Sequence, residues 1–402
     1  MKITKSIFGK EGNDIDKFNE LDLDERSIVF YSESSVILYP YVEEVIRELQ
    51  NRDQKICYLT SSKYDPIFKN KSKNIKVFYI GDSEIEKMNF FLRLKAKVLI
   101  MTMPDLGSYH IKRSKVFPVH YVYVFHTITS THMVFQKSAF DQFDSIFCIG
   151  QHQVQEIRAT EQLYNLKQKN LVECGYGLFD RLIRLRSSFT QQNFLSKNNK
   201  KNVLIAPSWG KQNLLESTGI ELIKILLDAG YHVTVRPHPM TVKKSSKLIK
   251  QIKEKFEKNS DFRLDTNTSS FDQLFSSYAL ITDWSGIAIE YAWGMFKPVI
   301  YIDTPKKVHN PDYEKIGIVP LEDQIRELNG IVLKTSNCDS INVEIEKALQ
   351  LKEEKRERLL NLRNKHIFNW GQSSNVAADY IINYCNKNGG KNFNLRFGLV
   401  RK

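Results

Sequence analysis

The sequence predicts an α/β protein with two domains, each built on a parallel sheet. Short β-rich apolar runs alternate with helical patterns throughout the 402 residues, and such alternation is typical of parallel strands joined by crossover helices. A polar segment poor in core residues, SSFTQQNFLSKNNKKN at 187–202, divides the alternation into two halves. We therefore expect a cleft between two domains, with ligands outside the carboxyl ends of the strands.

In the first half, apolar runs predict strands at 27–31, 55–60, 75–80, 97–101, 120–125, 145–149 and 170–173. Helical patterns lie between several of these runs, for example at 39–50 and 151–164. Cys57, Cys148 and Cys174 fall in strand-like runs, and we interpret them as small core residues. None of the five cysteines forms a C-x-x-C pair, so neither a disulfide framework nor a zinc site is expected, and a reducing cytosol fits.

The second half repeats the pattern. Strands are predicted at 202–206, 232–236, 279–282, 299–302 and 330–333, and helices at 219–229, 242–255, 271–276 and 286–293. From about Ile341 to near Lys387 the chain has a charged helical pattern. We place the domains at 1–186 and 202–370, with a linker at 187–201 and a C-terminal helix and tail at 371–402.

The charge balance favours an anionic partner. The formal net charge is +13, which suits nucleic acid, an anionic membrane surface or a phosphate-rich substrate. No nucleic-acid motif is present and the lysines are dispersed, so we do not expect nucleic acid. A non-catalytic polyanion binder stays open on charge alone. The N-terminus lacks the apolar core of a secretory signal, and no apolar run reaches the ~18 residues of a membrane span. Any membrane contact is therefore expected to be peripheral.

The segment Thr282-Asp283-Trp284-Ser285-Gly286 is the most informative in the chain. It lies between a predicted strand and a predicted helix. Asp283 or Ser285 can cap the helix, whose first free N–H groups then point into the corner. Such a helix start with small hydroxyl residues and a glycine suits an anion, so the corner predicts a phosphate or diphosphate ligand.

Three other predicted strand exits carry candidate site residues. Arg236 and His238 stand in an R-P-H-P segment that fixes where both side chains point, suited to a phosphate clasp and a proton donor. His126 is followed by several hydroxyl residues and suits a general base. Ser208 precedes Trp209 in a loop after the first strand of the second half. The structural alternative is a rigid turn for the R-P-H-P segment, a histidine that caps a loop for His126, and ordinary turn chemistry for Ser208.

Metal chemistry is not expected. Asp22 and Asp24 have the D-x-D spacing of some metal-dependent glycosyltransferases, but they sit among other acidic residues before the first strand, where a solvated loop is favoured. No other His, Cys or carboxylate cluster has metal-ligand spacing. The chain also lacks a Walker A loop, a G-x-G-x-x-G fingerprint and a G-x-S-x-G elbow, which argues against kinases, Rossmann dehydrogenases and α/β-hydrolases.

Six short boxes follow one another along the chain. They read VFHT at 124–127, FDSIF at 143–147, CGY at 174–176 with Asp180 after it, VLIAPSW at 203–209, RPHP at 236–239 and ITDWS at 281–285. Together they resemble the boxes WHGT, YD-x-V/I-F, GYPR-x-D, VLYAPTWR, R-x-H-P and LITDYSS of the CDP-glycerol glycerophosphotransferase family of teichoic-acid and capsule enzymes. The resemblance covers roughly residues 120–305; the first hundred residues give no specific match.

The resemblance implies a GT-B-like fold of two Rossmann-like domains, with the acceptor on the N-terminal domain and the nucleotide donor on the C-terminal one. It implies His126 and His238 as catalytic residues. For the donor phosphates and nucleotide it implies six residues: Ser208, Arg236, Thr282, Asp283, Ser285 and Gly286. The donor would be CDP-glycerol or a related CDP-polyol, used without a further cofactor, and CMP would leave. The acceptor would be a lipid-linked or polymeric polyol phosphate at the inner face of a bacterial cell membrane, in cell-envelope synthesis.

Three positions depart from the family boxes. Thr127 follows His126 directly where the family has a glycine, Gly210 stands in place of the arginine after Trp209, and Gly286 stands in place of a serine. All three lie where donor phosphate or acceptor is expected. The alternative is therefore a GT-B glycosyltransferase that uses a nucleotide sugar in surface polysaccharide synthesis, or a related sugar-nucleotide epimerase. The donor, the acceptor, priming versus extension, and the oligomeric state stay open.

Overall fold

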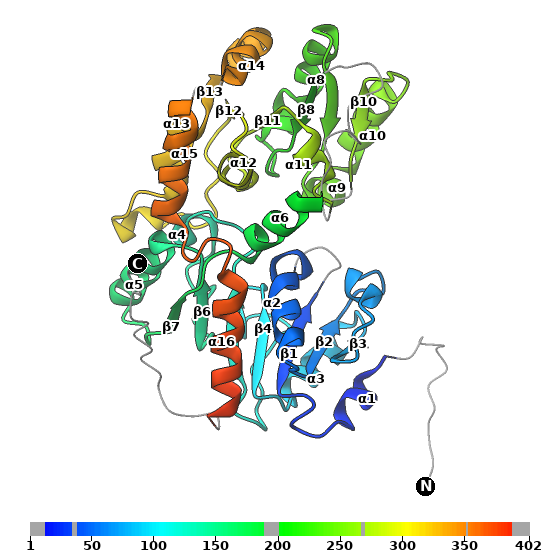
Figure 1. Cartoon of the computed structure of the whole chain (residues 1–402), viewed down its shortest axis with the longest axis vertical. Helices are drawn as coiled ribbons and strands as arrows, with labels where there is room; N and C mark the ends of the chain where they lie inside the picture. Colours follow the sequence, from blue (N-terminus) through cyan, green and yellow to red (C-terminus); the bar gives the residue numbers. More distant parts are fainter. Residues whose placement is uncertain (1–12, 34–37, 189–200, 267–269, 351–352, 388–402) are drawn as a thin grey trace.

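The structure, a computed structural model, describes residues 13–33, 38–188, 201–266, 270–350 and 353–387. Two parallel sheets stand one above the other (Figure 1). The predicted α/β fold with two parallel-sheet halves is confirmed. The predicted linker is described only at its ends, because residues 189–200 lie outside the described residues. The proposed domain boundaries therefore stay a prediction.

The N-terminal sheet has seven strands in the order β3-β2-β1-β4-β5-β6-β7. The bounds are β1 (Ile28–Ser32), β2 (Ile56–Thr60), β3 (Ile75–Tyr79), β4 (Val98–Met101), β5 (His120–Val124), β6 (Ser145–Cys148) and β7 (Asn170–Glu173). All neighbouring pairs are parallel. The central strands are near-continuous apolar runs because helices cover both faces of the sheet.

The C-terminal sheet has six strands in the order β10-β9-β8-β11-β12-β13, again parallel throughout. The bounds are β8 (Asn202–Ile205), β9 (His232–Val235), β10 (Phe262–Leu264), β11 (Ala279–Thr282), β12 (Val299–Asp303) and β13 (Ile331–Lys334). The sequence analysis missed β10. This edge strand has three residues with an exposed Arg263 at its centre, and so it carries no apolar run.

Helices flank both sheets. Those of the first half are α1 (Ile15–Asn19), α2 (Tyr39–Asn51), α3 (Glu84–Leu92), α4 (Thr131–Val134), α5 (Gln151–Leu163) and α6 (Gly177–Ser188). The second half has α7 (Leu214–Ser217), α8 (Gly219–Asp228), α9 (Pro239–Lys244), α10 (Ser246–Phe256), α11 (Asp272–Ser276), α12 (Ile287–Met295) and α13 (Leu321–Asn329). The predicted helix at 242–255 is two helices, since Ser245 leaves helical backbone angles at φ −121° and ψ 40°.

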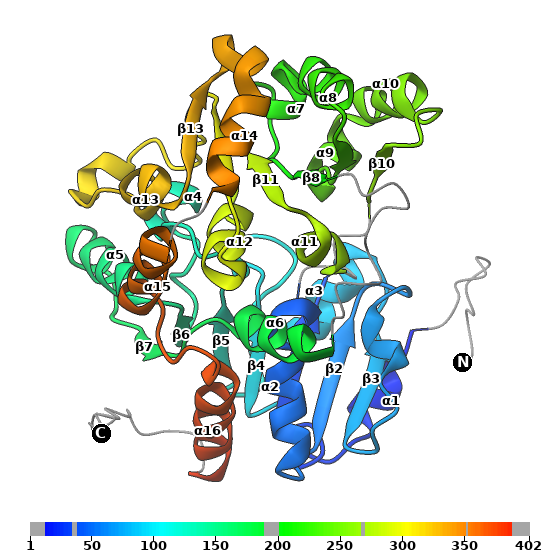
Figure 2. The same cartoon turned by 45° about the horizontal axis from the view of Figure 1, so that its top comes forward.

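The predicted helical tail is three helices, and the last one returns to the N-terminal sheet. They are α14 (Ile341–Leu349), α15 (Glu353–His366) and α16 (Ser373–Asn386). Figures 1 and 2 both show α16 beside α2, on the N-terminal half of the molecule. Ala377, Ala378 and Ile381 of α16 are buried in one core cluster with residues of α2 and of the N-terminal sheet. The chain therefore crosses between the two halves twice.

A close backbone approach secures this second crossing. Gly175 follows β7 with φ +96°, and a Cβ there would come within 2.3 Å of the carbonyl oxygen of Phe368. Only glycine suits both the conformation and the space. Nearby, Asp180 of α6 accepts hydrogen bonds from the backbone N–H and the hydroxyl of Ser374, each at 2.7 Å. The glycine segment at 175–177 therefore has a structural role.

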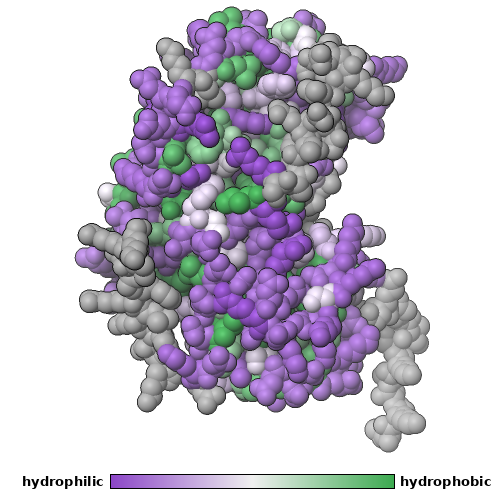
Figure 3. All heavy atoms as spheres, viewed as in Figure 1, coloured by the Kyte–Doolittle hydropathy of each residue, from purple (hydrophilic) through white to green (hydrophobic). Residues whose placement is uncertain are grey.

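The burial of Cys57, Cys148 and Cys174 confirms their interpretation as core residues. Hydrophilic side chains cover most of the face in Figure 3. All five cysteines are buried and free. Among the described residues, no helix is long and apolar enough to cross a membrane. Asp22 accepts a hydrogen bond from the backbone N–H of Glu25 at 2.8 Å, which is ordinary turn chemistry.

Candidate active site

His126 lies just beyond the carboxyl end of β5, on a loop that is anchored at three points. The carbonyl of Ile128 accepts a hydrogen bond from His152 Nε2 at 2.9 Å. The backbone N–H of Ser130 donates to both carboxylate oxygens of Glu322 at 3.1 Å. Thr131 donates its hydroxyl to Glu156 at 2.8 Å. Because Glu322 belongs to α13, the loop is held from both halves of the molecule, as a positioned catalytic group requires.

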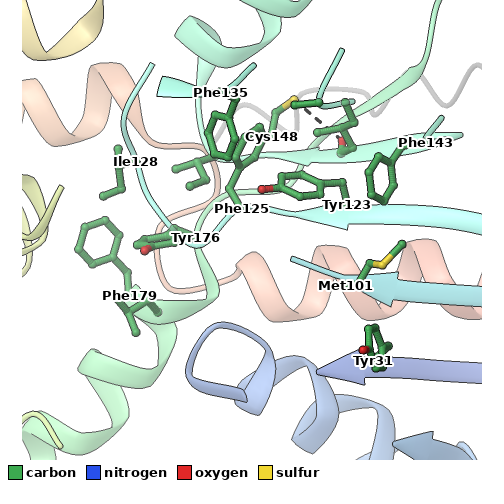
Figure 4. Close-up of a cluster of buried hydrophobic side chains, with 14 of the residues drawn as sticks. Tyr31, Met101, Tyr123, Phe125, Ile128, Phe135, Phe143, Cys148, Tyr176 and Phe179 are labelled. Atoms are coloured by element: carbon green, nitrogen blue, oxygen red, sulfur yellow. Dashed lines mark hydrogen bonds between the residues drawn. The ribbon is translucent and has the colours of Figure 1, made fainter. Parts of the chain in front are cut away.

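The imidazole of His126 rests against aromatic rings. It meets Tyr41 edge-on at 6.1 Å between ring centroids and Phe135 at 6.2 Å. Phe125 and Phe135 pack with Tyr123 in the same aromatic cluster, drawn in Figure 4. Nδ1 of His126 is buried and has no hydrogen-bond partner among the described residues. Burial lowers the pKa of His126 to about 4, so the ring is neutral at pH 7 and can accept a proton.

His238 approaches from the other half of the molecule. It follows β9 and caps α9, where its Nδ1 accepts a hydrogen bond from the backbone N–H of Met240 at 3.1 Å. In the neutral ring the proton is therefore on Nε2, which can donate. Burial, then the charge of Lys307, then His126 lower the pKa of His238 to about 3. The two predicted catalytic histidines thus come from different sheets and are close enough to interact electrostatically.

Asp283, at the centre of the most informative segment, faces inward. Its side chain is fully buried. One carboxylate oxygen accepts from the N–H of Ser208 at 2.7 Å and the other from the N–H of Leu214 at 3.1 Å. The carboxylate therefore fixes the loop after β8 that carries Trp209.

Three further predicted donor-binding residues are also buried and engaged within the protein. Thr282 donates its hydroxyl to the carbonyl of Ala206 at 2.7 Å. Arg236 donates through Nε and Nη2 to one oxygen of Asp265, at 3.0 and 2.6 Å. The hydroxyl of Ser208 accepts from the side chain of Asn213. Direct contact of a donor with these groups and with Asp283 stays a prediction. Their hydrogen bonds within the protein position the surrounding loops.

Ser285 and Gly286 remain at the partly exposed start of α12. A Cβ on Gly286 would lie 2.4 Å from Thr127 Oγ1 and 3.4 Å from a methyl of Thr129. The loop after His126 therefore packs directly on the helix start. Thr127 and Gly286 are two of the three departures from the family boxes, and they fit each other.

Changing Gly286 to serine is expected to push the two halves apart locally. The added Cβ overlaps Thr127 Oγ1, and overpacking of this kind costs about 1–3 kcal/mol. We expect a lower melting temperature and a loss of turnover, both measurable on the purified protein. The double variant Gly286→Ser/Thr127→Gly is the control, because it removes the overlapping hydroxyl. If Gly286→Ser alone behaves like the unchanged protein, the two loops are not in contact.

The sequence analysis missed a basic group on the loop after β12. Lys307 Nζ lies 4.3 Å from the ring centroid of Trp209, and Lys244 Nζ lies 4.7 Å from it. His309 packs 5.9 Å from the same ring, and His238 lies 6.2 Å from it. A pair of lysines directly after a predicted strand was the available signal, since strand exits are where ligands of such sheets bind.

The structure gives no metal centre in its described part. No group of three or more His, Cys, Asp or Glu residues there could hold a metal ion. His132 is buried and donates from Nε2 to the carbonyl of Ile318 at 2.9 Å. We term the group of His126, His238, Trp209, Ser285 and Lys307 the interdomain site.

Comparisons with known proteins extend this description. A family model described as CDP-Glycerol:Poly(glycerophosphate) glycerophosphotransferase matches residues 19–382. A search of curated protein sequences gives no significant match.

Solved structures share the fold at low sequence identity. One is the wall teichoic acid polymerase TagF soaked with CDPG (TM-score 0.60, 12% identity, 93% of this chain and 92% of that one covered). Another is S. aureus MnaA with UDP (TM-score 0.57, 13% identity, 91% and 99% covered). A third is the UDP-GlcNAc 2-epimerase from Neisseria meningitidis bound to UDP-GlcNAc (TM-score 0.55, 12% identity, 89% and 99% covered).

Proposed function

The chain belongs to the CDP-glycerol:poly(glycerophosphate) glycerophosphotransferase family of enzymes, and from this premise we propose that it transfers glycerol phosphate from CDP-glycerol to an acceptor hydroxyl. The acceptor oxygen attacks the distal phosphorus of the donor. The bond from that phosphorus to the bridging oxygen breaks, and CMP leaves. One observation carries the proposal: two buried histidines from different sheets interact electrostatically at the interdomain site, and lysine side chains that suit an anion lie beside one of them.

His126 takes the proton of the attacking hydroxyl. Its ring is neutral at pH 7 because burial disfavours the charged form. Nδ1 is buried without a partner, so the nitrogen available to substrate is Nε2. The anchors on the following loop hold the ring in place without a hydrogen bond to it. Positioned general bases of this kind contribute about 10²–10⁴ in rate.

His238 stabilises the phosphate charge that develops in the reaction. The bond from Met240 to its Nδ1 leaves Nε2–H as a donor, fixed in direction by the cap of α9. Ser285, at the start of α12, adds a hydroxyl donor from a neighbouring strand exit. Fixed donors of this kind stabilise charge at no cost of reorganisation during the reaction.

Four buried residues act as positioning residues in this proposal. Asp283 and Ser208 shape the loop of Trp209, Thr282 ties β11 to the chain after β8, and Arg236 holds the exit of β9 through Asp265. Their loops converge on the interdomain site.

The family and the structural similarity to TagF, a wall teichoic acid polymerase, support a proposal for the place of the reaction. We propose that the product belongs to a teichoic-acid-like or capsular polymer of the bacterial envelope. The acceptor is a lipid-linked or growing polyol phosphate, a polyanion that suits the net charge of +13. Use of such an acceptor would bring the protein to the cytoplasmic surface of the membrane as a peripheral protein.

A donor panel tests the proposal. CDP-glycerol, CDP-ribitol and a set of UDP- and CMP-sugars are supplied to the purified protein, each with and without lipid-linked acceptor. We expect turnover of a CDP-polyol that depends on the acceptor. Turnover of a nucleotide sugar with CDP-polyols inert would overturn the proposal and move the chain to the glycosyltransferases. Conversion of a sugar nucleotide without acceptor would instead indicate an epimerase.

A further inference from the structure

We infer that Lys307 supplies the cation that binds the diphosphate of the nucleotide donor. The inference rests on the proposed function and deepens it, because it names a ligand-binding residue of the same site. The family box that VLIAPSW resembles has an arginine where this chain has Gly210. Lys307 supplies a positive charge near this position from a different loop. Its Nζ lies over the ring of Trp209, the residue before Gly210.

The loop of Lys307 is fixed at both ends. On one side, Trp284 Nε1 donates to the carbonyl of Thr304 at 2.8 Å. On the other, His309 donates from its backbone N–H and from Nδ1 to carbonyl groups at the end of α4, at 3.0 and 2.9 Å. Because α4 belongs to the first half of the chain, this loop spans the two halves. The ammonium group of Lys307 is therefore held beside the histidines of the site.

The charge of Lys307 is not neutralised within the described residues. No carboxylate there forms an ion pair with its Nζ, and the nearby Asp283 and Glu216 act only through space. Both oxygens of Asp283 already accept backbone hydrogen bonds. Burial lowers the pKa of Lys307 to about 8, which is the effect of a cation held partly out of water.

The side chains near Lys307 include a second lysine and two histidines. Lys244 lies over the same ring of Trp209, and burial together with Lys307 lowers the pKa values of His238 and His309. The two lysine side chains over one ring attract a ligand of negative charge. A diphosphate fits this pair, because lysine binds phosphate as a point charge and charge-assisted hydrogen bonds are the strong ones.

Lys306, the preceding residue, offers a matched control. Its Nζ pairs with Asp323 and lies 5.7 Å from the ring of Trp284, so it is directed away from Trp209. The two lysines share sequence context and charge but differ in what they contact.

The test is calorimetric titration of CDP, UDP and inorganic diphosphate into the full chain and three variants. Lys307→Gln is expected to weaken the binding of the highest-affinity probe by about tenfold to a hundredfold, because one charge-assisted contact is lost. Lys307→Arg retains most of the affinity, and Lys306→Gln stays within about twofold of the unchanged protein. Melting temperatures of all variants confirm folding.

The results test the role of Lys307 separately from the proposed transfer reaction. CDP affinity in Lys307→Gln within twofold of the unchanged protein would overturn the inference while leaving acceptor-dependent transfer untouched. Preference for UDP over CDP, weakened by Lys307→Gln, would support the inference and count against CDP-glycerol as the donor. Failure of the unchanged protein to bind any of the three probes would also overturn it.

Discussion

Replacing His126 with alanine is expected to lower turnover by about 10²–10⁴-fold while the fold survives, because it removes the base that takes the acceptor proton. The side chain makes ring contacts but no hydrogen bond through Nδ1, so its loss leaves no buried partner unsatisfied. Turnover is measured as nucleotide release with donor and acceptor, and folding as the thermal transition. His232→Ala, at the amino end of β9, is the matched control and keeps its turnover.

The pH dependence of turnover tests the same role of His126 as the general base. The base form of His126 is the deprotonated one, and with a pKa of about 4 it persists well below pH 6.5. We expect kcat/KM for the donor to stay level from about pH 7 to about 5 and to fall as the pH approaches 4, since this parameter reports the free enzyme. Normal nucleotide release by folded His126→Ala protein would contradict the role of this residue.

Replacing Asp283 with alanine is expected to have the second large effect, on stability and on activity together. The change leaves the N–H groups of Ser208 and Leu214 buried without acceptors. Each such group costs about 1–3 kcal/mol, so the free energy of unfolding should fall by roughly 2–6 kcal/mol. The loop that carries Trp209 loses its anchor, so donor binding should weaken as well. Urea unfolding and donor titration measure the two effects.

Two variants control this prediction. Asp312→Ala removes a partly exposed carboxylate that pairs with the exposed Lys315 at 2.8 Å; exposed pairs contribute little to stability, so its urea midpoint should stay close to that of the unchanged protein. Asp283→Asn keeps one acceptor oxygen but turns an amide donor toward a second N–H. Its free energy of unfolding should lie between those of the unchanged protein and Asp283→Ala. Equal stabilities for Asp283→Ala and Asp312→Ala would mean that the buried hydrogen bonds of Asp283 contribute little.

The strands could be predicted from the sequence because their signal is local. β1 and β11 are short buried runs bounded by polar residues, so hydrophobicity alone marks them. β10 could not be found, since an edge strand with an exposed arginine lacks that signal. The packing of α16 on the first sheet could not be found either. It depends on contacts such as that of Tyr380 with Ser145, which are 235 positions apart in the chain. A local sequence pattern does not indicate which distant residue a helix packs against.

The site was partly predictable for the same reason. Strand exits mark ligand positions in parallel sheets, and this rule selected His126, His238 and Asp283. It does not say which way a side chain faces. Asp283 turned out to be buried and bound to backbone groups, whereas Lys307 faces Trp209. The fit of Thr127 against Gly286 is likewise a property of two loops brought together by the fold.

The most direct test of the proposed reaction is to identify the nucleotide that leaves when the protein turns over CDP-glycerol with its acceptor. Attack on the distal phosphorus releases CMP and moves glycerol phosphate to the acceptor; attack on a carbon of the glycerol releases CDP and moves glycerol alone. Separation of the two nucleotides after a single turnover distinguishes the reactions. We predict CMP, in an amount equal to the glycerol phosphate gained by the acceptor. CDP as the product would contradict phosphoryl transfer at this site.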